Sequence, residues 1–186
     1  MTEVSSLTGR LLVATPALAD PNFDRAVVLL LDHDDEGSLG VVLNRPTPVT
    51  VGDILAPWAE LAGEPGVVFQ GGPVSLDAAL GLAVIPGDEG PLGWRRVYGA
   101  IGLVDLETPP ELLGPAIGAL RIFAGYAGWG PGQLETELGD GAWYVVESEP
   151  GDVSSPRPET LWRQVLRRQR GELAMIATYP DDPSLN

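Results

Sequence analysis

The chain has 186 residues, a formal net charge of −15 at pH 7 and 44% hydrophobic residues, a composition typical of ordinary globular proteins. It contains no cysteine, one histidine and eleven basic residues, all of which are arginine. These counts exclude disulfides, thiolate metal sites, a cysteine nucleophile, lysine Schiff bases and a multi-histidine metal site within one chain.

The length predicts one domain over residues 1–186, with a frayed tail over residues 181–186. The N-terminal segment does not resemble a secretory leader, because Glu3 stands near its start and Pro16 interrupts its apolar run. The longest aliphatic run, residues 26–31, is far shorter than the ~20 residues that cross a bilayer. We therefore expect a soluble, cytoplasmic protein. Its acidic surface disfavours direct binding to nucleic acid or to a membrane.

A β-hairpin is predicted over residues 26–43. Residues 26–31 form the continuous apolar run of a buried strand, and residues 34–37 supply polar turn residues that end in Gly37. Residues 39–43 return as the second strand. This strand stops before Pro46, because proline cannot donate a hydrogen bond to a neighbouring strand.

Short helices and short strands alternate along the rest of the chain. Thr50 and Asp53 resemble a capping box before a helix that Pro57 kinks or restarts, and Thr108 and Glu111 resemble another. A third helix is expected after Pro131. Further strands are expected over residues 67–70, 80–85, 101–106, 120–124 and 142–146, loops over 86–93 and 149–158, and a helix over 161–170. This pattern predicts an α+β fold rather than a doubly wound sheet.

Five of the eleven arginines lie on or just before the last predicted helix, at positions 157, 163, 167, 168 and 170. Such a patch can grip a phosphate backbone. The favoured interpretation is that these arginines complement the helix dipole and offset the acidic body.

The run Asp-His-Asp-Asp-Glu at residues 32–36 resembles a metal site. Strand alternation, however, places Asp32 and His33 on opposite faces, and the remaining carboxylates fall in a solvated turn, so we expect no metal. His33 is chemically suited to act as a general base. The chain contains no Gly-x-Ser-x-Gly sequence and no visible nucleophile–base pair, so we expect His33 to be a surface residue.

The glycine-rich segment at residues 125–132 has two equally weighted interpretations. Its backbone N–H groups can cradle an anion before the next helix, or its glycines can form a tight turn that lets Tyr126 and Trp129 pack. The spacing does not fit the dinucleotide fingerprint, because Gln133 stands where its third glycine belongs.

Four segments together resemble the AlgH/YqgE family of bacterial proteins: residues 11–25 (LLVATPALADPNFDR), 40–46 (GVVLNRP), 70–74 (QGGPV) and 125–135 (GYAGWGPGQLE). The resemblance implies a compact α+β domain with a curved, mostly antiparallel sheet flanked by short helices. It implies no established reaction, cofactor or metal. The family's label as a putative transcriptional regulator comes from a proposed link to alginate gene control.

The resemblance also implies a binding site, for which no catalytic residue is predicted. Ten residues match family motif positions and are expected to converge on one surface: Asn44, Arg45, Pro46, Gly71, Gly72, Pro73, Tyr126, Trp129, Gln133 and Glu135. Arg45 is the foremost candidate, because its planar guanidinium suits a carboxylate or phosphate. The alternative is that Arg45 pairs internally with Glu135 and only joins two loops.

Three functions follow from these observations. The first is a non-enzymatic binding or regulatory module, whose pocket near Arg45 and Trp129 takes a small anion or a partner's peptide. The second is a transcription-linked regulator that acts through a protein partner. The third is a carboxylate-dependent hydrolase that uses Glu135 with His33, which requires these two side chains to lie within hydrogen-bond reach.

Overall fold

The computed structural model describes residues 6–18, 20–87 and 90–179, so the predicted frayed tail lies outside the described residues. Its ten strands form one curved sheet in the order β10-β1-β2-β3-β9-β6-β8-β7, with β5 also paired to β9 and β4 paired to β5. Every pairing is antiparallel except that of β5 with β9. The predicted α+β fold with a mostly antiparallel sheet is confirmed. The strands are β1 (Leu11–Ala14), β2 (Val27–Asp34), β3 (Gly37–Val42), β4 (Pro46–Thr50), β5 (Val67–Gln70), β6 (Val74–Val84), β7 (Trp94–Tyr98), β8 (Ile101–Val104), β9 (Ala119–Trp129) and β10 (Trp143–Val146).

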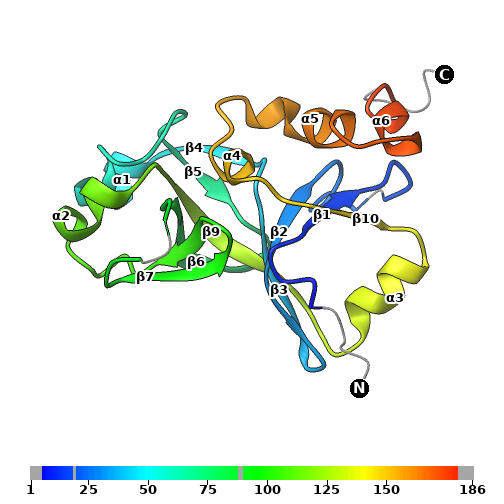
Figure 1. The fold of residues 1–186 in the computed structure, drawn as a ribbon, viewed down its shortest axis with the longest axis horizontal. Helices are drawn as coiled ribbons and strands as arrows, with labels where there is room; N and C mark the ends of the chain where they lie inside the picture. The colour runs from blue at the N-terminus through cyan, green and yellow to red at the C-terminus, as the bar shows by residue number, and fades with distance from the viewer. Residues whose placement is uncertain (1–5, 19, 88–89, 180–186) are drawn as a thin grey trace.

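Strand β9 belongs to both halves of this sheet. Its first part pairs with β6 on one side and with β5 on the other, and its last residues pair with β3. In Figure 1 the β5–β9 half lies on the left and the β1–β2–β10 half on the right, with β9 running between them.

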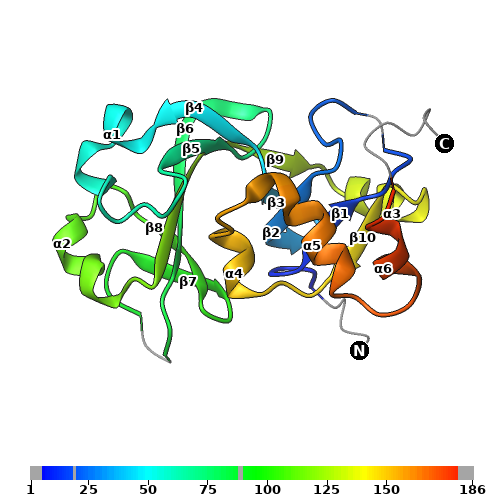
Figure 2. The same cartoon turned by 90° about the horizontal axis from the view of Figure 1, so that it is seen from above.

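Short helices cover the sheet. They are α1 (Val51–Ile54), α2 (Pro110–Leu113), α3 (Gln133–Gly139), α4 (Pro150–Val153), α5 (Leu161–Arg167) and α6 (Glu172–Ile176), together with 3₁₀ turns η1 (Ala56–Trp58), η2 (Gly114–Ala116) and η3 (Pro158–Thr160). Figures 1 and 2 show α4, α5 and α6 over one face of the β1–β2–β10 half, and α3 on the other side. Over the described residues, no helix has the length and apolarity to cross a membrane.

Alternation along β1 explains how one strand serves two cores. Leu11 and Val13 face the core that contains Trp162 and Val165 of α5, whereas Leu12 and Ala14 face the core beneath α3. All four β1 residues are buried, so the strand has no polar face. A third core joins α1, η1 and α2 to the β6–β9 half.

The predicted hairpin is confirmed as β2 and β3, and the strand at residues 67–70 is confirmed as β5. The structure adds β4, β7 and α6, which were not predicted. It also adds α4 within the loop predicted over residues 149–158, and η3 at the end of that loop. Strand β4 begins at Pro46, where a strand end was predicted; its residues are mostly exposed, and it has a paired neighbour only at β5. Proline is tolerated at such an edge.

The two predicted capping boxes are wrong. Thr50 is the N-cap of α1 but makes no side-chain cap hydrogen bond, and Pro109 rather than Thr108 is the N-cap of α2. A capping box does occur at α4, between Glu149 and Asp152, within a segment that its proline and glycine content suggested to be a loop.

The glycine-rich segment is also corrected. Residues through Trp129 continue strand β9, rather than forming the predicted turn or anion cradle. The reason is a close approach of backbones, because a Cβ on Gly71 would lie 2.4 Å from the Gly125 oxygen, and one on Gly72 would lie 2.2 Å from the Tyr126 carbonyl. The glycines therefore let the chain after β5 lie directly against β9.

Arg121 of β9 is a buried arginine that the sequence patterns did not single out. It is 2% exposed and donates hydrogen bonds to the backbone oxygens of Glu64 (3.0 Å) and Ser155 (2.8 Å). Its guanidinium carbon lies 4.2 Å from the centre of the Phe69 ring. Burial lowers the pKa of Arg121 to about 10. Its role is structural, because it joins two loops across the sheet.

Candidate functional site

Arg45 lies in the turn between β3 and β4 and is partly buried. Its Nη2 donates to the backbone oxygen of Asp24, and its own carbonyl accepts from the Gln70 N–H at 2.8 Å. Burial lowers the pKa of Arg45, and the nearby Asp24 carboxylate acts in the opposite direction. The guanidinium is therefore held between the loop before β2 and the turn after β3.

Asn44 is a buried positioning residue rather than a free binding group. Its Oδ1 accepts from the Val27 N–H at 3.0 Å, and its Nδ2 donates to the Arg25 carbonyl at 3.0 Å. Both hydrogen bonds attach the start of β2 to the end of β3. They fix the backbone on either side of Arg45 and Arg25.

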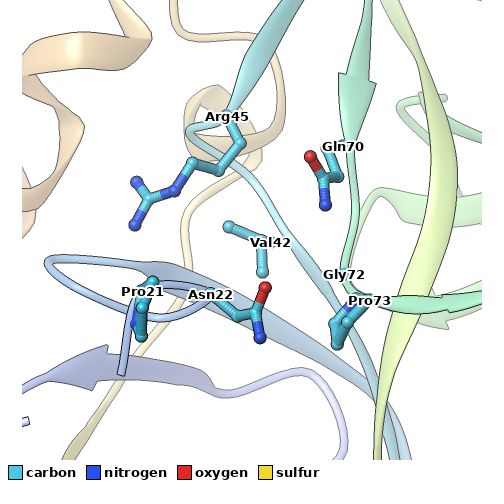
Figure 3. Close-up of a pocket in the computed structure, with 7 residues that line it drawn as sticks. All are labelled: Pro21, Asn22, Val42, Arg45, Gln70, Gly72 and Pro73. Atoms are coloured by element: carbon cyan, nitrogen blue, oxygen red, sulfur yellow. The ribbon is translucent and has the colours of Figure 1, made fainter. Parts of the chain in front are cut away.

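A small hollow of about 130 Å³, here called the amide pocket, lies on one side of Arg45 (Figure 3). In Figure 3 the Asn22 and Gln70 side chains approach Val42 from different sides. The complete lining is Pro21, Asn22, Val42, Arg45, Gln70, Gly72 and Pro73. Asn22 and Gln70 each supply both a hydrogen-bond donor and an acceptor.

A larger hollow of about 280 Å³, here called the arginine pocket, lies on the other side. It is lined by Arg25, Asn44, Arg45, Glu159, Trp162 and Arg163. Three of the eleven arginines of an acidic chain thus line one pocket, beside one carboxylate. Their guanidinium groups suit oxyanions such as carboxylate and phosphate.

Trp162 organises the arginine pocket. Its indole N–H donates to the Ala14 carbonyl at 2.8 Å, which fixes the ring. The guanidinium carbons of Arg25 and Arg163 lie 4.4 Å and 5.7 Å from the ring centre, within the range of cation–π attraction. Arg163 also donates to the Ala177 carbonyl. The cationic groups are therefore positioned before any ligand arrives.

Nine of the ten predicted site residues fall into two groups. Asn44, Arg45, Pro46 and the segment Gly71–Gly72–Pro73 lie around the end of β3, whereas Trp129, Gln133 and Glu135 lie near its beginning. Ser38 pairs with Trp129, and Val42 lines the amide pocket with Arg45. Ser38 and Val42 are about 13 Å apart along an extended strand. Tyr126 packs against the core beneath α5.

The alternative pairing of Arg45 with Glu135 is wrong. Arg45 donates to Asp24, and Glu135 lies 3.4 Å from Nε2 of His33. The structure therefore does bring His33 and Glu135 together, as the hydrolase hypothesis required.

His33 itself is not the surface residue that was expected. Its side chain is 4% exposed, and its Nδ1 lies 2.6 Å from Ser38 Oγ, so a serine–histidine pair that the sequence analysis did not find is present. The hairpin pattern carried the necessary signal, because a turn that pairs Asp34 with Gly37 also pairs His33 with Ser38.

The carboxylates at residues 32–36 do not assemble into a metal site. Asp32 is exposed and His33 is buried, so the two side chains lie on opposite faces of the strand, as alternation predicted. Within residues 6–18, 20–87 and 90–179, no group of three or more histidine and carboxylate residues is arranged to hold a metal ion.

The arginines of the patch predicted on the helix over residues 161–170 have different roles in the structure. Arg163 lines the arginine pocket, whereas Arg168 forms hydrogen bonds of 2.6 and 2.7 Å with Asp152. Asp152 accounts for most of the raised pKa of Arg168, through these hydrogen bonds. Arg167 points to solvent. The patch is thus not a continuous surface for a phosphate backbone.

Glu137 of α3 is an organising residue that sequence analysis missed. Its Oε1 accepts from the indole N–H groups of Trp129 (3.0 Å) and Trp143 (2.9 Å), and its Oε2 accepts from Gln133 (3.0 Å). Gln133 in turn accepts from the Gly130 N–H at 3.0 Å. The polar residues of this segment therefore hold α3 against the end of β9.

Replacing Glu137 by alanine is expected to lower the free energy of unfolding by about 3 kcal/mol, because two largely buried indole N–H groups lose their acceptor. Urea unfolding followed by tryptophan fluorescence measures this loss. Glu135→Ala in the same helix is the matched control. It should cost less than about 1 kcal/mol, since the Glu135 side chain is 52% exposed. Equal losses in the two variants would contradict the assigned role of Glu137.

The curved antiparallel sheet, its short helices and the glycine contacts between β5 and β9 together describe an α+β protein with a half-closed barrel. The chain belongs to the AlgH-like family, whose family model matches residues 11–174. The resemblance noted in the sequence is thereby confirmed.

Relatives match along nearly the whole chain. UPF0301 protein SCO2948 of Streptomyces coelicolor is 85% identical and covers 100% of this chain and 98% of its own. A UPF0301 protein of Thermobifida fusca is 52% identical, with 97% and 96% covered. The crystal structure of protein DIP2367 from Corynebacterium diphtheriae has a TM-score of 0.88 at 30% identity, covering 92% of each chain. The solution structure of the AlgH protein from Pseudomonas aeruginosa has a TM-score of 0.70 at 27% identity, covering 97% of each.

Proposed function

We propose that this protein is a binding module that takes a small anion or an anionic group of a partner in the arginine pocket. The observation that carries the proposal is the gathering of Arg25, Arg45 and Arg163 around one hollow, in a chain whose net charge is −15. An acidic protein repels anions over most of its surface, so a pocket with three guanidinium groups is a strong local exception.

The geometry also supports a ligand with more than one polar group. Arg45 borders both the arginine pocket and the amide pocket. An oxyanion held by the arginines therefore has amide donors and acceptors, those of Asn22 and Gln70, on the other side of the same guanidinium. The carboxylate of Glu159 supplies an acceptor for a hydroxyl or amine on the ligand.

A regulatory role fits the same pocket through a protein partner. A carboxylate side chain or the C-terminal carboxylate of a partner has the chemistry that the arginines bind. Direct contact with DNA is opposed by the net charge, and the arginines of the last helix are divided among separate roles. We infer that any effect on transcription passes through such a partner.

Arg45→Ala is expected to abolish ligand binding. A thermal-shift screen of inorganic phosphate, carboxylate metabolites, nucleotides, short nucleic acids and divalent ions would identify the ligand class. A ligand at 100 times its dissociation constant stabilises the native state by ~2.7 kcal/mol, or roughly 5–10 °C for a chain of this length. This shift should be seen in the wild type and lost in Arg45→Ala.

The matched control is Arg167→Ala, which removes the same charge from an exposed position on α5. It should keep the ligand-induced shift. Each shift is measured from the melting temperature of the unliganded variant, because Arg45 also holds the loop at Asp24. Loss of the ligand-induced shift in both variants would indicate a general charge effect and contradict ligand binding in the arginine pocket. An unchanged shift in Arg45→Ala would place the ligand elsewhere.

A further inference from the structure

His33, Ser38 and Glu135 form a continuous row at the opposite end of β3 from the arginine pocket. His33 on β2 lies directly across from Ser38 on β3. Its Nδ1 is 2.6 Å from Ser38 Oγ, and its Nε2 is 3.4 Å from Glu135 Oε2. A hydroxyl, an imidazole and a carboxylate thus follow one another in the order of nucleophile, base and orienting acid.

Glu135 determines which ring nitrogen carries the proton. An ionised carboxylate only accepts hydrogen bonds, so it favours the neutral tautomer of His33 with its proton on Nε2. Nδ1 then presents its lone pair to Ser38, whose hydroxyl donates to it. In this state the imidazole can withdraw the serine proton, with the two ring nitrogens exchanged relative to the chymotrypsin arrangement.

Solvent exposure differs between His33 and Ser38. The His33 side chain is 4% exposed, which shields the base from water. Ser38 is partly exposed, whereas the base that its hydroxyl contacts is held inside the protein.

We propose that Ser38 is a catalytic nucleophile for carboxylic esters. Ser38 Oγ bonds to the ester carbonyl carbon as its proton passes to His33 Nδ1. The bond from that carbon to the leaving alkoxide breaks, and the alkoxide takes the proton from Nδ1. Water then attacks the acyl-serine and gives its proton to Nδ1; the bond to Oγ breaks, and Oγ recovers the proton.

The test uses a neutral alkyl fluorophosphonate. Ser38 displaces fluoride and forms a stable phosphonyl adduct, which intact-mass spectrometry counts and peptide mapping locates. The wild type should gain one adduct, at Ser38. His33→Gln should slow labelling by about 100-fold or more.

Ser38→Ala should abolish the adduct, whereas Ser75→Ala should not change it. Ser75 is exposed, and the chain has no second histidine to activate it. Circular dichroism melting confirms that each variant is folded. The assignment of Ser38 as a nucleophile is overturned if the folded wild type takes up no phosphonate. It is also overturned if the adduct persists in Ser38→Ala. The site does not involve the arginine pocket, so neither outcome bears on anion binding there.

Discussion

Replacing Gly72 by alanine is expected to cost more than about 4 kcal/mol of unfolding free energy, a loss that few single substitutions reach. A Cβ at this position would lie 2.2 Å from the backbone carbon and oxygen of Tyr126. Backbone atoms in the middle of a sheet cannot move aside as a flexible side chain can. Gly72 also has φ +155°, a conformation that residues with side chains rarely adopt.

Chemical denaturation of Gly72→Ala measures this cost, and Gly66→Ala is its control. Gly66 stands just before β5, and a Cβ there would meet nothing within 4 Å. The control should remain within about 0.5 kcal/mol of the wild type, since it adds a methyl group in open space. Similar stabilities of the two variants would show that the chain after β5 does not lie tightly against β9.

Asp152→Ala is expected to destabilise the protein by about 3 kcal/mol, which lowers the melting temperature by about 6–12 °C. Asp152 is 3% exposed, and both of its oxygens accept from Arg168, at 2.6 and 2.7 Å. One of these oxygens also accepts from the Glu149 N–H at 2.7 Å, which begins α4. The substitution therefore removes an ion pair and a helix cap at once. This expected loss lies at the low end of the range for breaking a buried ion pair, because the Arg168 side chain is partly exposed.

This pair should be intact at neutral pH. The Asp152 hydrogen bonds raise the pKa of Arg168 above its ordinary, already strongly basic value, so their stabilisation is present at neutral and mildly basic pH and is lost only in strong alkali. A double-mutant cycle with Arg168→Ala separates the pair from the cap. Asp35→Ala, in the exposed hairpin turn, is the control for loss of one negative charge. A loss in Asp152→Ala no larger than in Asp35→Ala would contradict the role of the pair.

Sequence patterns predicted the fold where hydrophobic periodicity and turn chemistry agree. The β2–β3 hairpin follows from an apolar run, a polar turn and Gly37, and β5 from a short apolar run closed by glycines. Strands β4 and β7 escaped prediction, because few of their residues are buried and they lack an apolar run. The extension of β9 through its glycines depends on a contact with Gly71 and Gly72, which are distant in sequence.

The residues of the candidate site were likewise predicted only in part. Arg45 was predicted from its segment, and it lies in a pocket with Asn44, as expected of neighbours. Trp162 and Arg163 were not predicted to join it, because α5 reaches this pocket only after the chain has completed β9 and β10. Ser38 was missed for a simpler reason, since the register of the hairpin was not followed across to His33.

The position of β9 has a consequence for the order in which the molecule is made. Strands β3, β5 and β6 emerge from the ribosome before β9, yet each of them pairs with it. At about 5–20 residues per second, synthesis from Val42 to Trp129 takes about 4–17 s. During that interval the apolar edge of β3 has no permanent neighbour on that side. The nascent chain thus depends on a late strand to cover an early one, which makes aggregation during translation the main hazard of this topology.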